Sequence, residues 1–109
     1  MDSSEAHERV DRLLAGLDDG AGLLDQHGEI HWAQWMRTVR AEIQRNDAHG
    51  LRRLLQAYGG MGSFNDVVLT HLNSHQIATM QERMVNERLA ALRSSMYSDA
   101  TALLHDLDA

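Results

Sequence analysis

Apolar residues recur every three to four positions along most of this chain, and this spacing limits the possible folds more than any other feature of the sequence. Residues spaced in this way line one side of an α-helix and can be buried together against a neighbour. The chain has no proline that would interrupt such helices. The pattern therefore predicts an all-α protein. The first stripe consists of Val10, Leu13, Leu14, Leu17, Ala21 and Leu24.

The first two predicted helices follow each other closely in the sequence. The first runs from a cap at Ser3 or Ser4 to about Gln26, and Gly28 is expected to end it. Glycines inside this helix permit a kink, although the apolar stripe keeps its phase past them. The second helix covers about residues 29–45. Its apolar face consists of Trp32, Trp35, Met36, Val39 and Ile43.

A shorter third helix is predicted after a cap at Asn46 or Asp47. Gly59 is expected to end it in the left-handed conformation. After the glycine-rich segment, residues 67–77 predict an extended or irregular connection with a β-like core in "DVVLT". The apolar face of the third helix consists of Leu51, Leu54, Leu55 and Tyr58.

The longest periodic segment begins where Thr79 and Glu82 match the capping-box pattern T-x-x-E, and it continues to the C-terminus. We therefore expect residues 1–109 to form a single all-α domain of four helices. Three shorter helices pack on a long C-terminal helix, and a glycine-rich elbow precedes that helix. The expected buried face of the long helix consists of Met80, Met84, Leu89, Leu92, Met96, Ala100, Leu103 and Leu107.

Composition and charge exclude several classes of function. The chain has no cysteine, which excludes disulfides, thiolate nucleophiles and cysteine zinc sites. It shows no signal peptide and no apolar run of membrane-spanning length, so the expected compartment is the cytoplasm. The net charge is −6, and residues 1–29 hold eight acids and two arginines. Such a surface disfavours nucleic acid and anionic membranes and favours a basic protein partner, unless it serves only solubility.

The segment "YGGMGSFNDVVL" is better explained as a turn than as a phosphate cradle. A Walker loop needs a lysine, which the chain lacks, and a dinucleotide fingerprint needs a preceding strand. Ser63 and Asp66 fit an S-x-x-D cap on one following turn, and Met61 can plug into the core. Asn65 and Asp66 are either caps or contacts with a partner. The predicted structural elbow consists of Gly59, Gly60, Gly62 and Ser63.

The string "GGMGSFNDVVL", followed by "NSH" and "NERLAALRSSMY", resembles an uncharacterised bacterial family of small proteins that share a GGMGS-[FL]-ND signature. The similarity runs from Trp32 to Leu104, with its most specific part at Gly60–Val67. The family's N-G-H-like step reads Asn73-Ser74-His75 here. The family in turn resembles the small immunity proteins encoded beside polymorphic bacterial toxins. This resemblance implies that the chain binds a protein toxin.

No catalytic, metal or cofactor site is predicted. The pairs His27/His31 and His71/His75 have helical spacing, but "HGEIH" is not H-E-x-x-H and no third ligand is indicated. Ser63, a histidine and Asp66 could be named as a triad, but their spacing is better explained by capping. The basic run at Arg45, Arg52 and Arg53 lacks the interleaved aromatic residues of an RNA site, and pairing with the acidic first helix is the simpler expectation.

The function that this sequence favours is a non-catalytic interaction protein, namely an immunity protein that binds and neutralises a cognate toxin with a basic surface. The alternative is a structural or regulatory module that self-associates through an exposed part of the long helix. A small helical enzyme or ligand carrier is a further alternative, which would need a pocket between the first and last helices. The predicted partner contacts are Asp11, Asp18, Asp19, Asp25, Glu29, Asn65 and Asp66.

Overall fold

The computed structural model describes residues 1–59 and 62–108, and within them the protein is all-α, as the apolar spacing predicts. No residue in these two ranges lies in a β-strand, so the β-like core expected in "DVVLT" is an extended connection instead. The α-helices are α1 (Ser3–Gln26), α2 (Ile30–Gln44), α3 (Ala48–Gln56) and α4 (Glu82–Asp108). Single turns of 3₁₀ helix between α3 and α4 are η1 (Phe64–Asp66), η2 (His71–Asn73) and η3 (Thr79–Gln81).

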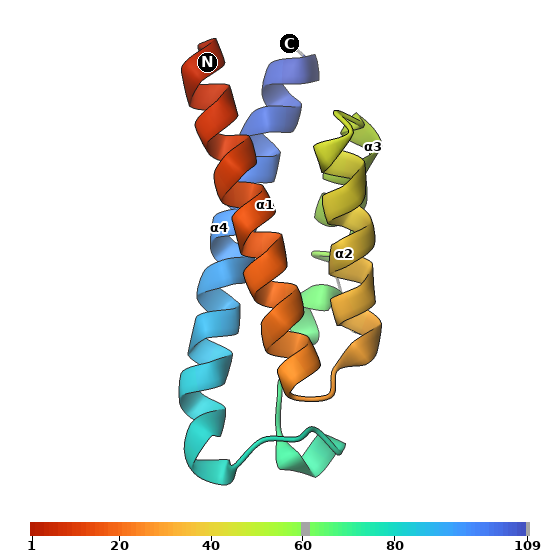
Figure 1. Cartoon of the computed structure of the whole chain (residues 1–109), viewed down its shortest axis with the longest axis vertical. Helices are drawn as coiled ribbons and strands as arrows, with labels where there is room; N and C mark the ends of the chain where they lie inside the picture. Colours follow the sequence, from red (N-terminus) through yellow and green to blue (C-terminus); the bar gives the residue numbers. More distant parts are fainter. Residues whose placement is uncertain (60–61, 109) are drawn as a thin grey trace.

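The α-helices form an up-and-down bundle in which neighbours in sequence run in opposite directions (Figure 1). α1 packs on α2 and α4, and α3 also packs on α2 and α4, so the helices close into a ring around one core. Both termini lie at one pole, where the Met1 ammonium group is 3.7 Å from the Asp106 carboxylate. The α1–α2 turn and the start of α4 lie at the other pole. The predicted architecture of a long C-terminal helix packed with three shorter ones is confirmed.

The helix ends follow known capping rules, but three of the predicted positions are wrong. They are the α1 cap at Ser3 or Ser4, the α3 stop at Gly59, and the capping box of Thr79 and Glu82. The Asp2 carboxylate caps α1 by accepting the Glu5 N–H at 2.8 Å, in place of the predicted Ser3 or Ser4. Aspartate and serine cap about equally well, so the sequence does not choose between neighbours. Gly28 does end α1, with φ of +82° and the Glu29 N–H donated to the Leu24 carbonyl. Asp47 caps α3, which is one of the two predicted residues.

α3 ends at Gln56, three residues before the predicted stop at Gly59, and Gly59 does not have a positive φ. The left-handed residues of the described chain stand elsewhere, at Gly28, Asn46, Gly62 and Ser74. The α3 C-cap is Ala57 in an ordinary helical conformation. A glycine after an apolar stripe is therefore not enough to place a left-handed stop, because a tertiary contact can end the helix earlier.

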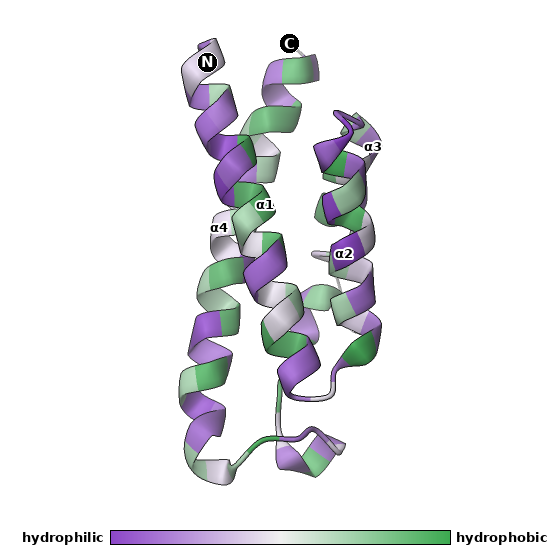
Figure 2. Ribbon diagram, in the orientation of Figure 1, coloured by the Kyte–Doolittle hydropathy of each residue, from purple (hydrophilic) through white to green (hydrophobic). Residues whose placement is uncertain are grey.

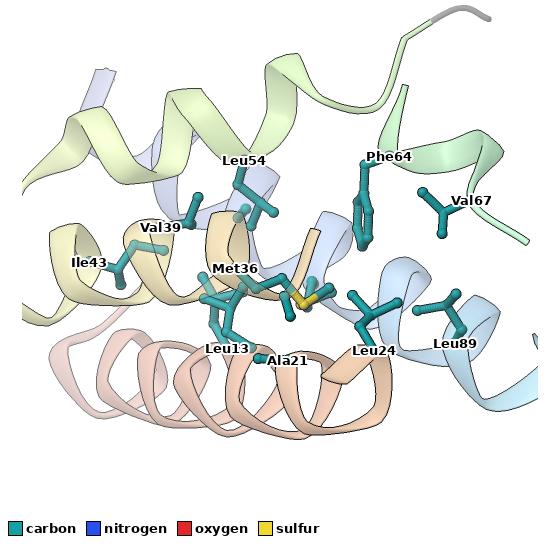
Figure 3. Close-up of a cluster of buried hydrophobic side chains, with 14 of the residues drawn as sticks. Leu13, Ala21, Leu24, Met36, Val39, Ile43, Leu54, Phe64, Val67 and Leu89 are labelled. Atoms are coloured by element: carbon teal, nitrogen blue, oxygen red, sulfur yellow. The ribbon is translucent and has the colours of Figure 1, made fainter. Parts of the chain in front are cut away.

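Apolar side chains from every α-helix meet along the axis of the bundle, while polar residues cover its outside (Figure 2). Gly20 explains why glycines are tolerated within α1, since a Cβ there would lie 2.7 Å from the Met36 sulfur. The glycine lets α2 approach closely, and Met36 fills the space between the two helices (Figure 3). The buried core includes Leu13, Leu17, Ala21, Leu24, Ala33, Met36, Val39, Ile43, Leu51, Leu54, Leu89, Met96, Ala100 and Leu103.

The predicted buried face of α4 is correct in its middle and wrong at both ends. Leu89, Met96, Ala100 and Leu103 are buried and Leu92 is partly buried. Three other predicted members are exposed. A continuous apolar stripe in the sequence does not show where a helix extends beyond the helices that pack on it. Their exposed fractions are 93% for Met80, 70% for Met84 and 62% for Leu107. The first turns of α4 extend past the α1–α2 turn and therefore have no helix to cover them (Figure 1).

Phe64 anchors the long connection between α3 and α4 to the core of the bundle. Its side chain is fully buried, and its ring centroid lies 5.1–5.6 Å from the rings of Trp32, Trp35 and Tyr58. The Arg93 guanidinium lies over the other side of the cluster, 5.7 Å from the Phe64 ring centroid. One residue of η1 thus contacts side chains from α2, from the segment just after α3, and from α4, which fixes the position of η1 on the bundle. Figure 3 shows the Phe64 ring pointing into the cluster of buried side chains.

A buried carboxylate links α1 to α4 and was missed by the sequence analysis. Asp99 is 2% exposed, and its two oxygens accept hydrogen bonds of 2.7–2.9 Å from Arg9 and Arg12. The hydrogen bond from Arg12 is the main cause that lowers the pKa of the Asp99 carboxyl. Asp99 is three residues after the buried Met96, so its place on the core face of α4 was a visible signal for a partnered charge.

Replacement of Phe64 by alanine is expected to lower the free energy of unfolding by about 3–5 kcal/mol, because it leaves a cavity inside the aromatic cluster. Chemical denaturation followed by tryptophan fluorescence measures this change, since Trp32 and Trp35 both contact Phe64. The control is Val68→Ala in the same connection, where the side chain is 52% exposed. A loss for Phe64→Ala no larger than that for Val68→Ala would contradict the anchoring role.

Replacement of Asp99 by asparagine is expected to lower the free energy of unfolding at neutral pH by about 1.5–3 kcal/mol, through loss of charge-assisted hydrogen bonds. Because the pKa of Asp99 is lowered in the folded state, its contribution is present above the ordinary carboxyl pKa of about 3.9 and is lost as the pH falls below that value. Thermal unfolding of both proteins between neutral pH and pH ~3 tests this. The difference in stability between them should shrink in acid, and a constant difference would contradict the assignment.

Candidate functional site

Backbone contacts made by Gly62 and Phe64 place η1 against the bundle. Gly62 has φ of +79°, as a predicted tight reversal requires, and the Phe64 N–H donates to the Ala57 carbonyl at 3.0 Å. Ser63 occupies the N-cap position of η1, but its side chain makes no capping hydrogen bond. Asp66 instead accepts the Gly62 N–H at 2.8 Å. Asp66 therefore does cap the turn, one residue earlier than the predicted S-x-x-D arrangement.

Two of the residues named in the sequence analysis, Gly60 of the predicted elbow and Met61, lie outside the described residues.

The connection beyond η1 is fastened to the first turns of α4 by side-chain hydrogen bonds. Asn86 exchanges two hydrogen bonds with the Leu69 backbone, at 2.8 and 2.7 Å. The Glu82 carboxylate accepts from the Thr70 hydroxyl, the His71 N–H and the His71 ring. The bond from the His71 N–H is the main cause that lowers the pKa of Glu82. The predicted capping box of Thr79 and Glu82 is therefore wrong, because a tertiary partner takes the Glu82 side chain.

The same connection is fastened to the α1–α2 turn by two histidines. His27 is 5% exposed, and its Nδ1 donates to the Gln76 carbonyl at 2.7 Å. His75 accepts the Thr70 N–H on Nδ1, so its other nitrogen, Nε2, donates to Glu29 at 3.1 Å. The imidazole therefore accepts on one nitrogen and donates from the other, which links the Thr70 backbone to the Glu29 carboxylate.

Ser74 has φ of +64° and ends η2 in the left-handed conformation, which glycine adopts most easily. A serine adopts this conformation at some cost in strain. This turn directs His75 back toward Glu29.

A pocket of about 300 Å³ opens where the α1–α2 turn, η1 and the residues around η2 meet. Glu29 and Asp66, two of the predicted partner contacts, both line it, although 37 positions separate them in the sequence. Their carboxylates accept hydrogen bonds from the backbone N–H groups of Trp32 and Gly62 and from the His75 ring. Neither forms an ion pair with an arginine within the described chain. The lining residues are Glu29, Trp32, Gly62, Ser63, Asp66, Val67, Val68, Asn73 and His75.

The predicted contacts on the first helix lie outside this pocket, and most of them have an arginine partner. Asp18 pairs with Arg40 at 2.6 Å, and Asp25 pairs with Arg37. Asp19 lies 4.0 Å from Arg88 of α4. Asp11 is exposed on the outer side of α1. Asp18 and Asp19 line an open hollow of about 410 Å³ together with Arg88, so these acids form a solvated, partly neutralised surface.

The basic run does not pair with the first helix as expected. Arg53 pairs with the buried Glu42 and Arg52 pairs with Asp108, so the arginines of α3 bind α2 and α4. The arginines that reach α1 from other helices are Arg37 and Arg40 of α2 and Arg88 of α4. Net charge by segment could not reveal this, because it ignores which helix faces which.

Asn65, the remaining predicted contact, faces a different pocket. It lines a hollow of about 390 Å³ with Tyr58 and residues of α4. The adjacent Asn65 and Asp66 therefore serve two separate pockets on either side of η1.

No group of three histidine, aspartate or glutamate side chains with metal-binding geometry occurs in residues 1–59 and 62–108. None of the helices described is both long enough and apolar enough to cross a bilayer.

Comparison with known proteins gives one match. Residues 25–78 match the model of a family described as a domain of unknown function, DUF6966. The matched stretch is just under half of the chain, and it contains every residue that lines the pocket of Glu29 and Asp66. No curated protein and no solved structure matches the chain.

The two glycines that flank the undescribed residues are expected to respond differently to alanine. Gly62→Ala should destabilise the protein by about 1–2 kcal/mol, because alanine resists a φ of +79°. A Cβ at either position would meet nothing within 4 Å, so crowding does not contribute. Gly59→Ala is the matched control and should leave the stability unchanged or slightly raised. Urea denaturation measures both, and an equal loss at both positions would contradict this assignment of the turn.

Proposed function

We propose that this protein is a non-catalytic interaction protein, specifically an immunity protein that binds and neutralises a cognate bacterial toxin in the cytoplasm. One observation supports this proposal above the others. The pocket beside η1 is lined by two carboxylates, Glu29 and Asp66, whose hydrogen-bond donors among the described residues are backbone N–H groups and the His75 ring. The negative charge of the pocket thus remains available for a cation from outside.

The chemistry of the pocket fits an arginine or lysine side chain of the partner. The indole of Trp32 lines the same wall, and an aromatic face next to carboxylates attracts a cation by both ion pairing and cation–π contact. A volume of about 300 Å³ accommodates one such side chain. A basic side chain buried there would act as the anchor of the interface, and the surrounding surface would exclude water from it.

The acids of α1 have a different part in this proposal. Asp18, Asp19 and Asp25 already have arginine partners, so their contribution to a complex comes from the field of the whole acidic face. Charges at the rim of an interface act mainly on the rate of association and on its salt dependence. We assign to α1 the steering of a basic toxin surface toward the pocket.

Self-association is the second candidate, and one observation favours it. Met80 and Met84 are 93% and 70% exposed at the start of α4, and Leu72 of η2 is 81% exposed. Large apolar side chains in such positions are typical of contact surfaces between proteins. A solution mass equal to two chains, lowered to one by Met80→Ser and Met84→Ser, would support this candidate over the immunity function.

The test of the proposal begins with co-purification of the tagged protein with the product of each neighbouring gene. The expected result is a stoichiometric complex with a protein that kills cells when it is expressed alone. The double substitution Glu29→Gln and Asp66→Asn should then weaken the complex roughly thirtyfold or more, mainly through faster dissociation. Charge reversal at Asp18 and Asp19 should instead slow association.

The matched control is Glu87→Gln, which removes one carboxylate from an exposed ion pair with Arg83 on α4. It should leave the affinity unchanged. Thermal unfolding of each variant establishes that the pocket substitutions leave the fold intact. Recovery of the protein without a toxic partner, or a complex that tolerates the double substitution, would contradict the proposal. Unchanged association after charge reversal would contradict the role of α1.

A further inference from the structure

The pocket that Asn65 lines differs in charge from the pocket of Glu29 and Asp66. It has a volume of about 390 Å³ and opens between the end of α3, η1 and the middle of α4. Among the residues that the structure describes, Arg93 is the only charged one that lines this pocket, and none of the lining residues is a carboxylate. The other lining residues are Tyr58, Asn65, Ala90, Ser94 and Tyr97.

Arg93 is a partly buried cation without a carboxylate partner at ion-pair distance in the described chain. One of its terminal nitrogens, Nη1, donates to the carbonyls of Phe64 and Val67, both at 2.9 Å. Burial is the main cause that lowers the pKa of this guanidinium. The charge of Asp66, which lies beyond ion-pair distance, acts on that pKa in the opposite direction. Removing a cation from water is costly unless a counter-charge is supplied. The guanidinium therefore retains an unfilled capacity to bind an anion.

The Arg93 guanidinium is held by the Phe64 and Val67 carbonyls and lies 5.7 Å from the Phe64 ring centroid. The Tyr58 hydroxyl donates to the backbone carbonyl of Arg93 at 2.7 Å, and the Tyr58 and Tyr97 ring centroids are 5.1 Å apart. Tyr97 is 48% exposed, so one aromatic face is available at the mouth of the pocket. The Asn65 amide and the Ser94 hydroxyl are the hydrogen-bond donors that complete the wall.

We infer that this pocket is an anion site that takes a carboxylate group on Arg93 and Asn65, next to the exposed ring of Tyr97. A planar carboxylate matches the planar guanidinium, and an attached aromatic or apolar group can lie on Tyr97. The source of the carboxylate is an aspartate or glutamate side chain of the protein partner. The assignment of the carboxylate to a protein partner rests on the proposed function, whereas the assignment of an anion site does not.

This assignment gives the Asn-Asp pair of the signature a joint role. Asn65 serves a pocket for an anion and Asp66 serves a pocket for a cation, and the short η1 helix holds both in a fixed relation. A partner that presents one basic and one acidic side chain at matching separation would engage both pockets. A partner with the charges reversed would be rejected at both.

The site is tested on the free protein by titration with benzoate, acetate and inorganic phosphate, followed by NMR signals of the Asn65 amide and the Arg93 Nε–H. The expected result is a saturable shift confined to the pocket, with benzoate binding more tightly than acetate. Asn65→Ala should weaken benzoate binding roughly tenfold through loss of one hydrogen bond to a charged group. Arg93→Gln should abolish it.

Two variants keep the test decisive if Arg93→Gln fails to fold. Asn65→Ala removes an exposed side chain, and Arg83→Gln on the same helix is the control, since Arg83 is exposed and lies outside the pocket. The absence of a saturable shift, tighter binding of phosphate, or an equal effect of Asn65→Ala and Arg83→Gln would overturn the carboxylate site. Benzoate binding without any effect of Asn65→Ala on the protein complex would overturn the partner as its source. If only the Glu29 and Asp66 substitutions left the complex unweakened, that result would contradict the proposed function and not the anion site.

Discussion

The burial of one aromatic ring holds together the part of this protein that distinguishes it from a plain helical bundle. The connection between α3 and α4 has little regular structure, and its described part buries Phe64, Val67 and Leu69 in the core. Phe64 enters the core among Trp32, Trp35 and Tyr58, and Arg93 lies over its ring while it binds two carbonyls of the same turn. The ring therefore fixes η1, and η1 in turn fixes Asn65 and Asp66. Both pockets depend on that single insertion.

The order and extent of the helices could be predicted because apolar spacing is a local property of the sequence. The main errors arise where the surroundings in the fold, which spacing along the chain does not encode, decide the outcome. Glu82 fits a capping box with Thr79, but the Thr70–His71 segment takes its carboxylate. Gly59 fits a helix stop, but α3 ends earlier and the left-handed glycine is Gly62. Met80 continues the stripe of α4, yet it lies beyond the helices that could cover it.

The candidate site could be predicted only in part. Glu29 was predicted as a contact because it belongs to the acidic first segment of the chain. Asn65 and Asp66 were predicted because they follow the glycine-rich segment. Their grouping into two pockets could not be predicted, because it depends on how the connection crosses the bundle. Long-range bonds from Asn86 and His75 set that path, and spacing along the chain does not encode them. Trp32 was assigned to the core alone, although an aromatic residue near an acidic turn was a signal for a cation site.

The pairing of the two chain ends has a practical and evolutionary consequence. Met1 and Asp106 meet at the pole opposite the α1–α2 turn, while the pocket of Glu29 and Asp66 is built on that turn. A domain fused to either end would project away from this pocket and leave it open. A short linker between the two ends would span little distance, so the chain could be circularly permuted with new ends at the α2–α3 turn. The topology thus allows this bundle to be recombined with other domains without rebuilding this pocket.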